Sequence, residues 1–164
     1  MTFQKLFLLL FFGITSFISA GVPTIEKTYS KEFYENGHVK SEGWLTMDIK
    51  TDYWIYYHPN GVIKAKGHFK NNKKTGYWYF YSEINEKLKE GHYYNGLAEQ
   101  WWIFYDIANE EETKFQYKKN KKNGFALIYK NNRLIRAEKY KDDTKIGEWT
   151  SVIAFKRDNP NVTF

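Results

Sequence analysis

The sequence predicts an all-β protein, a single-layer twisted antiparallel meander of about five β-hairpin repeats of 23–24 residues. Three observations support this. Residue types recur at intervals of 24, aromatic residues make up 20% of the chain, and Asn-rich or Asn-Gly turns separate the aromatic runs. Aromatic side chains favour pleated sheet. A period of this size indicates an open, solenoid-like array in which each unit packs mainly on its neighbours.

Several sets of residues recur in the same phase. Trp54, Trp78 and Trp102 are 24 residues apart, and Gly67 and Gly91 keep the same interval. The last unit is one residue shorter, because Gly124 and Gly147 are separated by 23. The residues that we expect to define the repeat and build the sheet are Trp54, Tyr57, Gly67, Phe69, Gly76, Trp78, Tyr81, Gly91, Tyr93, Trp102, Tyr105, Tyr117, Gly124, Tyr129, Tyr140, Gly147 and Trp149.

One unit contains two strands and two turns. Tyr53–Tyr57 has strand composition, Pro59-Asn60-Gly61 is a turn, and Val62–Phe69 is a second strand. Asn-Gly suits a tight hairpin because both central residues can take positive φ. The Lys- and Asn-rich block 70–76 then leads into the next unit, and Asp142-Asp143 occupies the equivalent turn. Two strands per unit give 10–11 strands in a repeat domain at 31–155, with closing strand material after Trp149, a lead-in at 21–30 and a tail at 156–164.

This pattern resembles the MORN-repeat family, in its bacterial variant form. The matching residues run from Trp54 and Tyr57 through Asn60-Gly61 and Gly67 to Phe69, and end at Lys74-Thr75-Gly76. Unit 3 carries Asn85-Glu86 where other units have Asn-Gly, and unit 5 has Ala126 in place of Trp. The resemblance implies consecutive β-hairpins. It also implies protein scaffolding, membrane or lipid association in some members, and an antitoxin role in some bacterial relatives.

Residues 1–20 read as a secretory signal peptide. Lys5 precedes an apolar run, and small residues around Ser19-Ala20 fit a cleavage site. The apolar stretch of about 14 residues is shorter than the ~20 needed to span a bilayer. We therefore expect export to a periplasm or the cell exterior, although a retained membrane anchor is the alternative.

Strand alternation places Tyr53, Ile55 and Tyr57 on one face with Ile63, Ala65, Gly67 and Phe69, if Tyr57 lies opposite Ile63. Trp54 and Tyr56 then share the other face with Lys64, Lys66 and His68. A slip of one residue would exchange these assignments. Such an aromatic and basic face either holds the sheet together or binds a ligand. The possible binding surface comprises Trp54, Tyr56, Trp78, Phe80, Trp102 and Phe104, with the turn lysines Lys70, Lys73, Lys74, Lys118, Lys119, Lys121 and Lys122.

Little in the sequence suggests catalysis. There is no Cys, which excludes disulfides, thiolate metal sites and a Cys nucleophile. His68 and His92 occupy one repeat column, two strands and therefore about 10 Å apart, too far to share one zinc ion. Glu110–Glu112 lacks the pattern of a calcium loop. We assign no catalytic residue, metal site or cofactor and expect a protein that is not an enzyme.

The expected role is an interaction or scaffold module. A protein partner would lie along the sheet or add a strand at an open end. One alternative is peripheral binding to an anionic membrane or polysaccharide through the lysine turns, favoured by the net charge of +6. Another is antitoxin- or immunity-like neutralisation of a protein. An exported chain disfavours nucleic acid, and we expect no small-molecule substrate.

Overall fold

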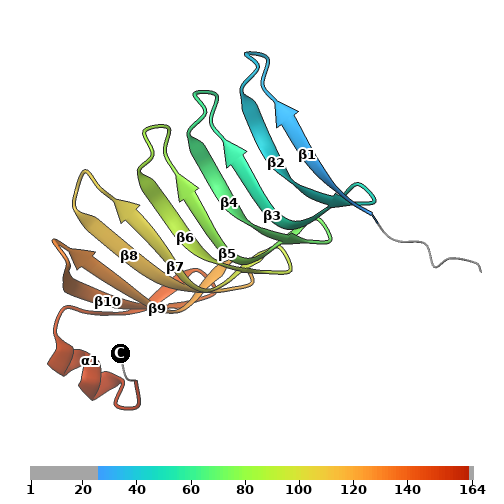
Figure 1. Cartoon of the computed structure of the whole chain (residues 1–164). Coiled ribbons are helices and arrows are strands. Elements are labelled where there is room, and N and C mark those ends of the chain that lie inside the picture. Colours follow the sequence, from blue (N-terminus) through green and yellow to red (C-terminus); the bar gives the residue numbers. More distant parts are fainter. Residues whose placement is uncertain (1–25, 163–164) are drawn as a thin grey trace, which may run out of the picture.

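The computed structural model describes residues 26–162. Its 11 strands form one sheet, in which each strand pairs antiparallel with the next along the chain (Figure 1). The predicted single-layer hairpin meander is confirmed, whereas the predicted signal peptide lies outside the described residues. The strands are β1 (Lys27–Phe33), β2 (Val39–Thr46), β3 (Ile49–Tyr57), β4 (Ile63–Lys70), β5 (Lys73–Tyr81), β6 (Lys87–Tyr94), β7 (Leu97–Asp106), β8 (Glu111–Lys118), β9 (Lys121–Lys130), β10 (Arg133–Lys141) and β11 (Thr144–Trp149).

Two-residue turns close the hairpins along one edge of the sheet. Asn71 and Asn72, between β4 and β5, have φ angles of 52° and 61°. Positive φ at both positions is typical of a type I′ turn, which matches the twist of the flanking strands. Asn72 also contacts the preceding hairpin, because its N–H donates to Lys50 O at 3.1 Å and its Oδ1 accepts from Lys50 N at 2.7 Å. Asp143 makes the same pair of contacts with Lys122, in the turn expected.

The Asn-Gly turns on the opposite edge differ from our expectation. Only the glycine has positive φ, 84° at Gly61, so the prediction of positive φ at both residues is wrong. Asn60 instead uses its side chain: Oδ1 accepts from Val62 N at 3.1 Å, and Nδ2 donates to Glu83 O at 2.8 Å. In unit 3, Asn85 takes the glycine position with φ of 64°.

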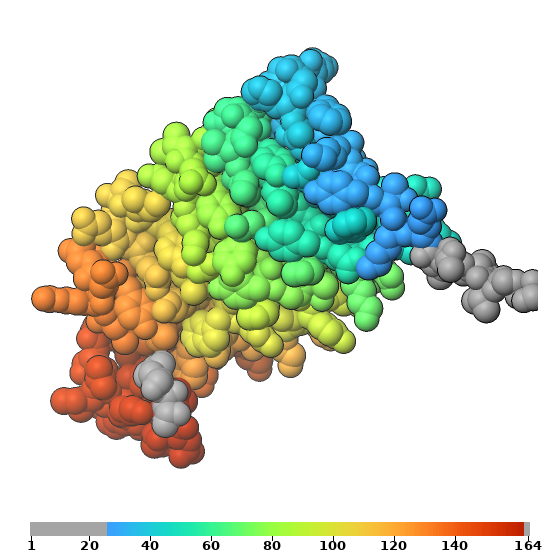
Figure 2. Space-filling model, viewed as in Figure 1, coloured from blue at the N-terminus to red at the C-terminus, as the bar shows by residue number. Residues whose placement is uncertain are grey.

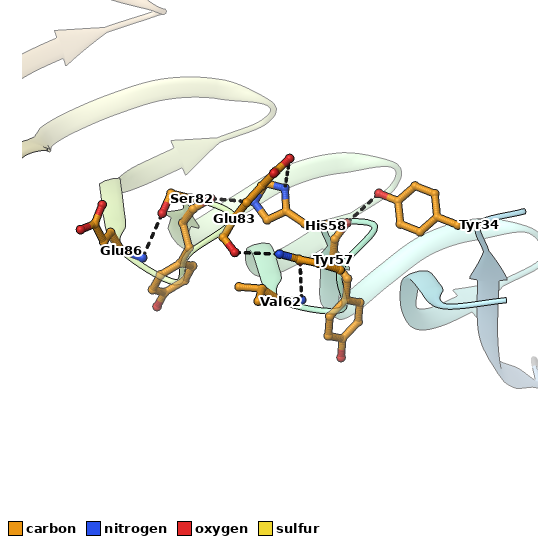
Figure 3. Close-up of polar contacts among 9 residues, drawn as sticks. Tyr34, Tyr57, His58, Val62, Ser82, Glu83 and Glu86 are labelled. Carbon is orange, nitrogen blue, oxygen red and sulfur yellow. Dashed lines mark hydrogen bonds and ion pairs between the residues drawn. The ribbon is translucent and has the colours of Figure 1, made fainter. Parts of the chain in front are cut away.

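The first two turns on this edge are each tied to the next one by a side chain. The Tyr34 hydroxyl donates to Tyr57 O at 2.8 Å, and the ring Nε2 of His58 lies 3.0 Å from Tyr81 O (Figure 3). Tyr34 and His58 occupy the same repeat column. The two edges of the sheet are therefore linked between hairpins as well as within them.

β-Bulges decide which face each side chain occupies. Tyr57 pairs with Ile63 as expected, but the register shifts between Tyr56 and Tyr57, so Trp54 pairs with Gly67. Trp54 therefore lies on the same face as Phe69, with ring centroids 6.1 Å apart, and the predicted separation of these two residues is wrong. Lys66 and His68 lie on the other face, contrary to our expectation, where Lys66 contacts Tyr79 and His68 contacts Tyr53. One extra residue in a strand inverts the alternation beyond it.

The chain leaves the sheet after β11 and forms a short helix, α1 (Val152–Asp158), at the C-terminal end of the sheet (Figures 1 and 2). The predicted closing strand material up to residue 155 is therefore wrong. Phe155 is 2% exposed and packs with Leu127, Ala137 and Trp149. At the other end, β1 begins at Lys27, inside the segment that we assigned to the lead-in. No helix within residues 26–162 is long and apolar enough to cross a membrane.

Candidate binding site

One face of the sheet carries Trp54, Trp78 and Trp102, and we call it the tryptophan face. Neighbouring rings on it are in contact from β3 to β10, with centroids 4.9–6.4 Å apart in successive pairs. This series comprises Trp54, Phe69, Trp78, Tyr93, Trp102, Phe104, Phe115 and Tyr140. Edge-on and offset ring pairs stabilise a sheet beyond the area that they bury. The rings therefore form the core of a sheet that has no second layer.

The three tryptophans are structural. They are 1%, 0% and 3% exposed, so within the predicted binding surface they offer a ligand almost no area. The indole N–H of Trp78 donates to His68 O at 3.1 Å, ten residues back in the chain, and Trp102 repeats this contact with His92. A Cβ on Gly67 would lie within 3.0 Å of the Trp78 ring, so the glycine column provides the space for the indole. Tyr56, Phe80 and Phe104 remain partly exposed on this face.

The junction of units 4 and 5 reverses this arrangement of large and small residues. Phe115 occupies the glycine column and Ala126 the tryptophan column, and these two residues pair directly between β8 and β9. Ala126 is fully buried. The departures from the repeat pattern thus compensate each other.

Lysine side chains from one repeat column lie over the rings of the tryptophan face. The Nζ atom is 4.1 Å from the Trp54 ring centroid for Lys50, 4.5 Å from Trp78 for Lys74, and 3.8 Å from Phe115 for Lys122. Lys74 and Lys122 are therefore not part of the sheet edge where we predicted them. Lys70, Lys73, Lys118, Lys119 and Lys121 are exposed at that edge, and none of them makes an ion pair within the described part of the chain.

A groove of about 380 Å³ opens on the tryptophan face across β2 to β5. Three lysines contribute to its wall together with aromatic rings, and no carboxylate does. The lining residues are Tyr34, Lys40, Tyr56, Tyr57, Lys64, Ala65, Lys74, Trp78 and Phe80. Volumes of this size are typical of small-molecule sites, which combine apolar walls with a few polar groups.

Lys74 is the least solvated cation in this groove. Burial lowers its pKa, and the neighbouring charge of Lys89 lowers that pKa further. Its ammonium faces only rings, those of Trp78, Phe80 and Tyr93, at 4.5–5.1 Å. It makes no hydrogen bond or ion pair within residues 26–162. Cation–π contact offsets part of the cost of burying this charge but leaves its three N–H donors unused.

The opposite face carries a charge ladder that our sequence analysis missed. Glu42, Lys66, Glu90 and Lys114 recur every 24 residues with alternating sign, a signal visible in the sequence. Each contacts a tyrosine 15 residues later. The hydroxyls of Tyr57 and Tyr105 donate to Glu42 and Glu90 at 2.6 and 2.5 Å, while Lys66 and Lys114 lie over the rings of Tyr81 and Tyr129.

The carboxylates of this ladder are already neutralised. Lys31 is 2.9 Å from Glu42, and Lys87 is 3.0 Å from Glu90. The hydrogen bond from Tyr57 and the one from Lys31 lower the pKa of Glu42, while burial and the Glu42 hydrogen bond raise the pKa of Tyr57. On this face the carboxylates are paired internally and Lys66 lies over tyrosine rings, whereas the groove on the tryptophan face carries positive charge with no carboxylate in its wall.

Apolar side chains are exposed together at the C-terminal end of the sheet. β11 pairs with Ala137–Lys141 only, so the first part of β10 has no strand on that side. Leu134, Ile135 and Val152 line a small cavity there with Trp149 and Phe155. Leu134 and Ile135 are each 42% exposed, and Val152 and Ile153 are 67% and 83% exposed. We call Leu134, Ile135, Val152 and Ile153 the C-terminal apolar patch.

No group of three or more His, Asp or Glu side chains in the described residues has the geometry of a metal site. No protein-family model matches the chain, and no curated protein matches it significantly. The likeness to MORN repeats is therefore still a prediction from the residues.

Proposed function

We propose that this protein is an exported, non-enzymatic interaction module that binds a protein partner at the C-terminal end of its sheet. The observation that carries the proposal is the C-terminal apolar patch beside the first part of β10, which has no strand on its β11 side. Single exposed apolar residues are ordinary, but neighbouring ones around a cavity are typical of interaction sites. An incoming strand would pair with β10 and place an apolar side chain against Leu134 and Val152.

A site-specific photo-crosslinking experiment tests this proposal. A photoreactive residue replaces Ile153 in the full chain, expressed in its own host. The matched control carries the same residue at Ile84, which is 75% exposed but lies at a hairpin turn far along the sheet. We expect one discrete adduct from position 153 that persists at high salt and disappears in Val152→Asp. Equal crosslinking from both positions, or none, would contradict the proposal.

A second candidate function rests on the exposed lysine edge. Lys70 and Lys73 are two units away from Lys118, Lys119 and Lys121 along one edge, all without carboxylate partners in the described residues. Such an edge fits an anionic membrane surface, where each basic residue contributes about 1 kcal/mol. The assay is sedimentation with anionic and with neutral vesicles. Salt-sensitive binding that is lost in Lys73→Glu with Lys121→Glu, but kept in Val152→Asp, would favour this function over the first.

A further inference from the structure

The groove on the tryptophan face contains a cation whose hydrogen-bonding capacity is unused. The equivalent lysine one repeat earlier uses this capacity. In the preceding unit, Lys50 lies over Trp54 and donates to the Tyr56 hydroxyl at 3.0 Å. The residue equivalent to Tyr56 is Phe80, which has no hydroxyl. Lys74 therefore keeps the ring contacts of its counterpart and lacks the acceptor.

We propose that this groove binds a small organic carboxylate with an apolar body, and that Lys74 is its main cationic contact. The carboxylate accepts hydrogen bonds from the Lys74 ammonium, while the apolar body packs against the partly exposed rings of Phe80 and Tyr56. Lys40 and Lys64 are exposed, line the same groove and add positive charge at its opening. This inference does not depend on the protein partner proposed above, which binds at the far end of the sheet.

Charge and burial together favour an anion over a neutral ligand. An ammonium that is half-buried among rings has lost water and has gained no acceptor. Hydrogen bonds between charged groups are about twice as strong as neutral ones, so a carboxylate recovers more of this loss than an alcohol does. An inorganic anion would pair with the lysine charge but would make no apolar contact with the aromatic rings of the groove wall. Both parts of the ligand are therefore needed.

Titration calorimetry on the protein with four probes tests the specificity. Octanoate and 2-naphthoate carry the same charged group on an acyl chain and on a flat ring, and their relative affinities identify which body the groove prefers. The probes 1-octanol and inorganic phosphate each lack one of the two features. We expect at least one carboxylate to bind tenfold or more tightly than 1-octanol and than inorganic phosphate. Failure of both carboxylates to bind, or affinities of both carboxylates no higher than that of 1-octanol or of phosphate, would overturn the proposal.

Three variants locate the site. Lys74→Met keeps the length of the side chain and removes the charge, and we expect carboxylate affinity to fall at least tenfold. Lys64→Glu changes an exposed residue at the groove opening, does not threaten folding, and should weaken binding severalfold. Lys122→Met is the matched control, because Lys122 lies over Phe115 outside the groove. An equal loss in Lys74→Met and Lys122→Met, or no loss in Lys64→Glu and Lys74→Met, would refute the assignment.

Discussion

The pairing of small and large residues on the tryptophan face predicts a size-swap experiment at Gly67 and Trp78. Adding a side chain at Gly67 places its Cβ within 3.0 Å of the Trp78 ring, which is 0% exposed. Overpacking of this kind costs about 1–3 kcal/mol, and more for a side chain as large as Phe. Trp78→Ala leaves a cavity and removes the indole hydrogen bond, at a cost of about 3–5 kcal/mol.

The double variant Gly67→Phe with Trp78→Ala reproduces the arrangement of Phe115 and Ala126. The Phe ring then has the space that the indole leaves. We therefore expect the double variant to lose less stability than the sum of the two single variants, with a coupling of about 1–3 kcal/mol. Urea denaturation followed by circular dichroism measures the free energy of unfolding of all four proteins. Strictly additive losses would refute the account in which glycine is required only to accommodate tryptophan.

Three further predictions concern the helix, the charge ladder and the turns. Phe155→Ala should cost about 3–5 kcal/mol because the ring is 2% exposed, whereas Ile153→Ala, at 83% exposed, should change stability by less than about 0.5 kcal/mol; equal melting temperatures would contradict the docking of α1. Burial and the Glu90 hydrogen bond raise the pKa of Tyr105 above the unfolded value of about 10, so its contribution to stability is complete below that pH and is lost as pH rises above it. Tyr105→Phe should flatten this alkaline loss in the free energy of unfolding, and an unchanged pH profile would count against the assignment. Asn60→Ala removes two hydrogen bonds and should lower the melting temperature by about 2–12 °C, at about 0.5–1.5 kcal/mol per bond, while Asn60→Asp should retain the Val62 contact and lose less.

The sequence pattern predicted part of the candidate groove. Of the residues that line it, Tyr56, Lys74, Trp78 and Phe80 were in the binding surface predicted from the sequence, whereas Lys40 was not. The sequence did not distinguish core residues from ligand contacts among them: Trp78 is completely buried, whereas Lys74 is only half-buried. Burial depends on how adjacent strands pack, which composition does not reveal. The C-terminal apolar patch was missed because its residues come from β10 and from a helix that the repeat pattern does not anticipate.

The sequence by itself determined the repeat length, the hairpin order and the number of strands. It could do so because neighbouring units bury equivalent columns of side chains, and the constraint on each column recurs every 24 residues. Tertiary structure decided which face each column occupies. A bulge such as the one between Tyr56 and Tyr57 inserts one residue and inverts the alternation of side chains beyond it. Hydrogen bonding between strands fixes the position of such a bulge. Because the period of the sequence is the same on either side of it, the period does not reveal where the bulge lies.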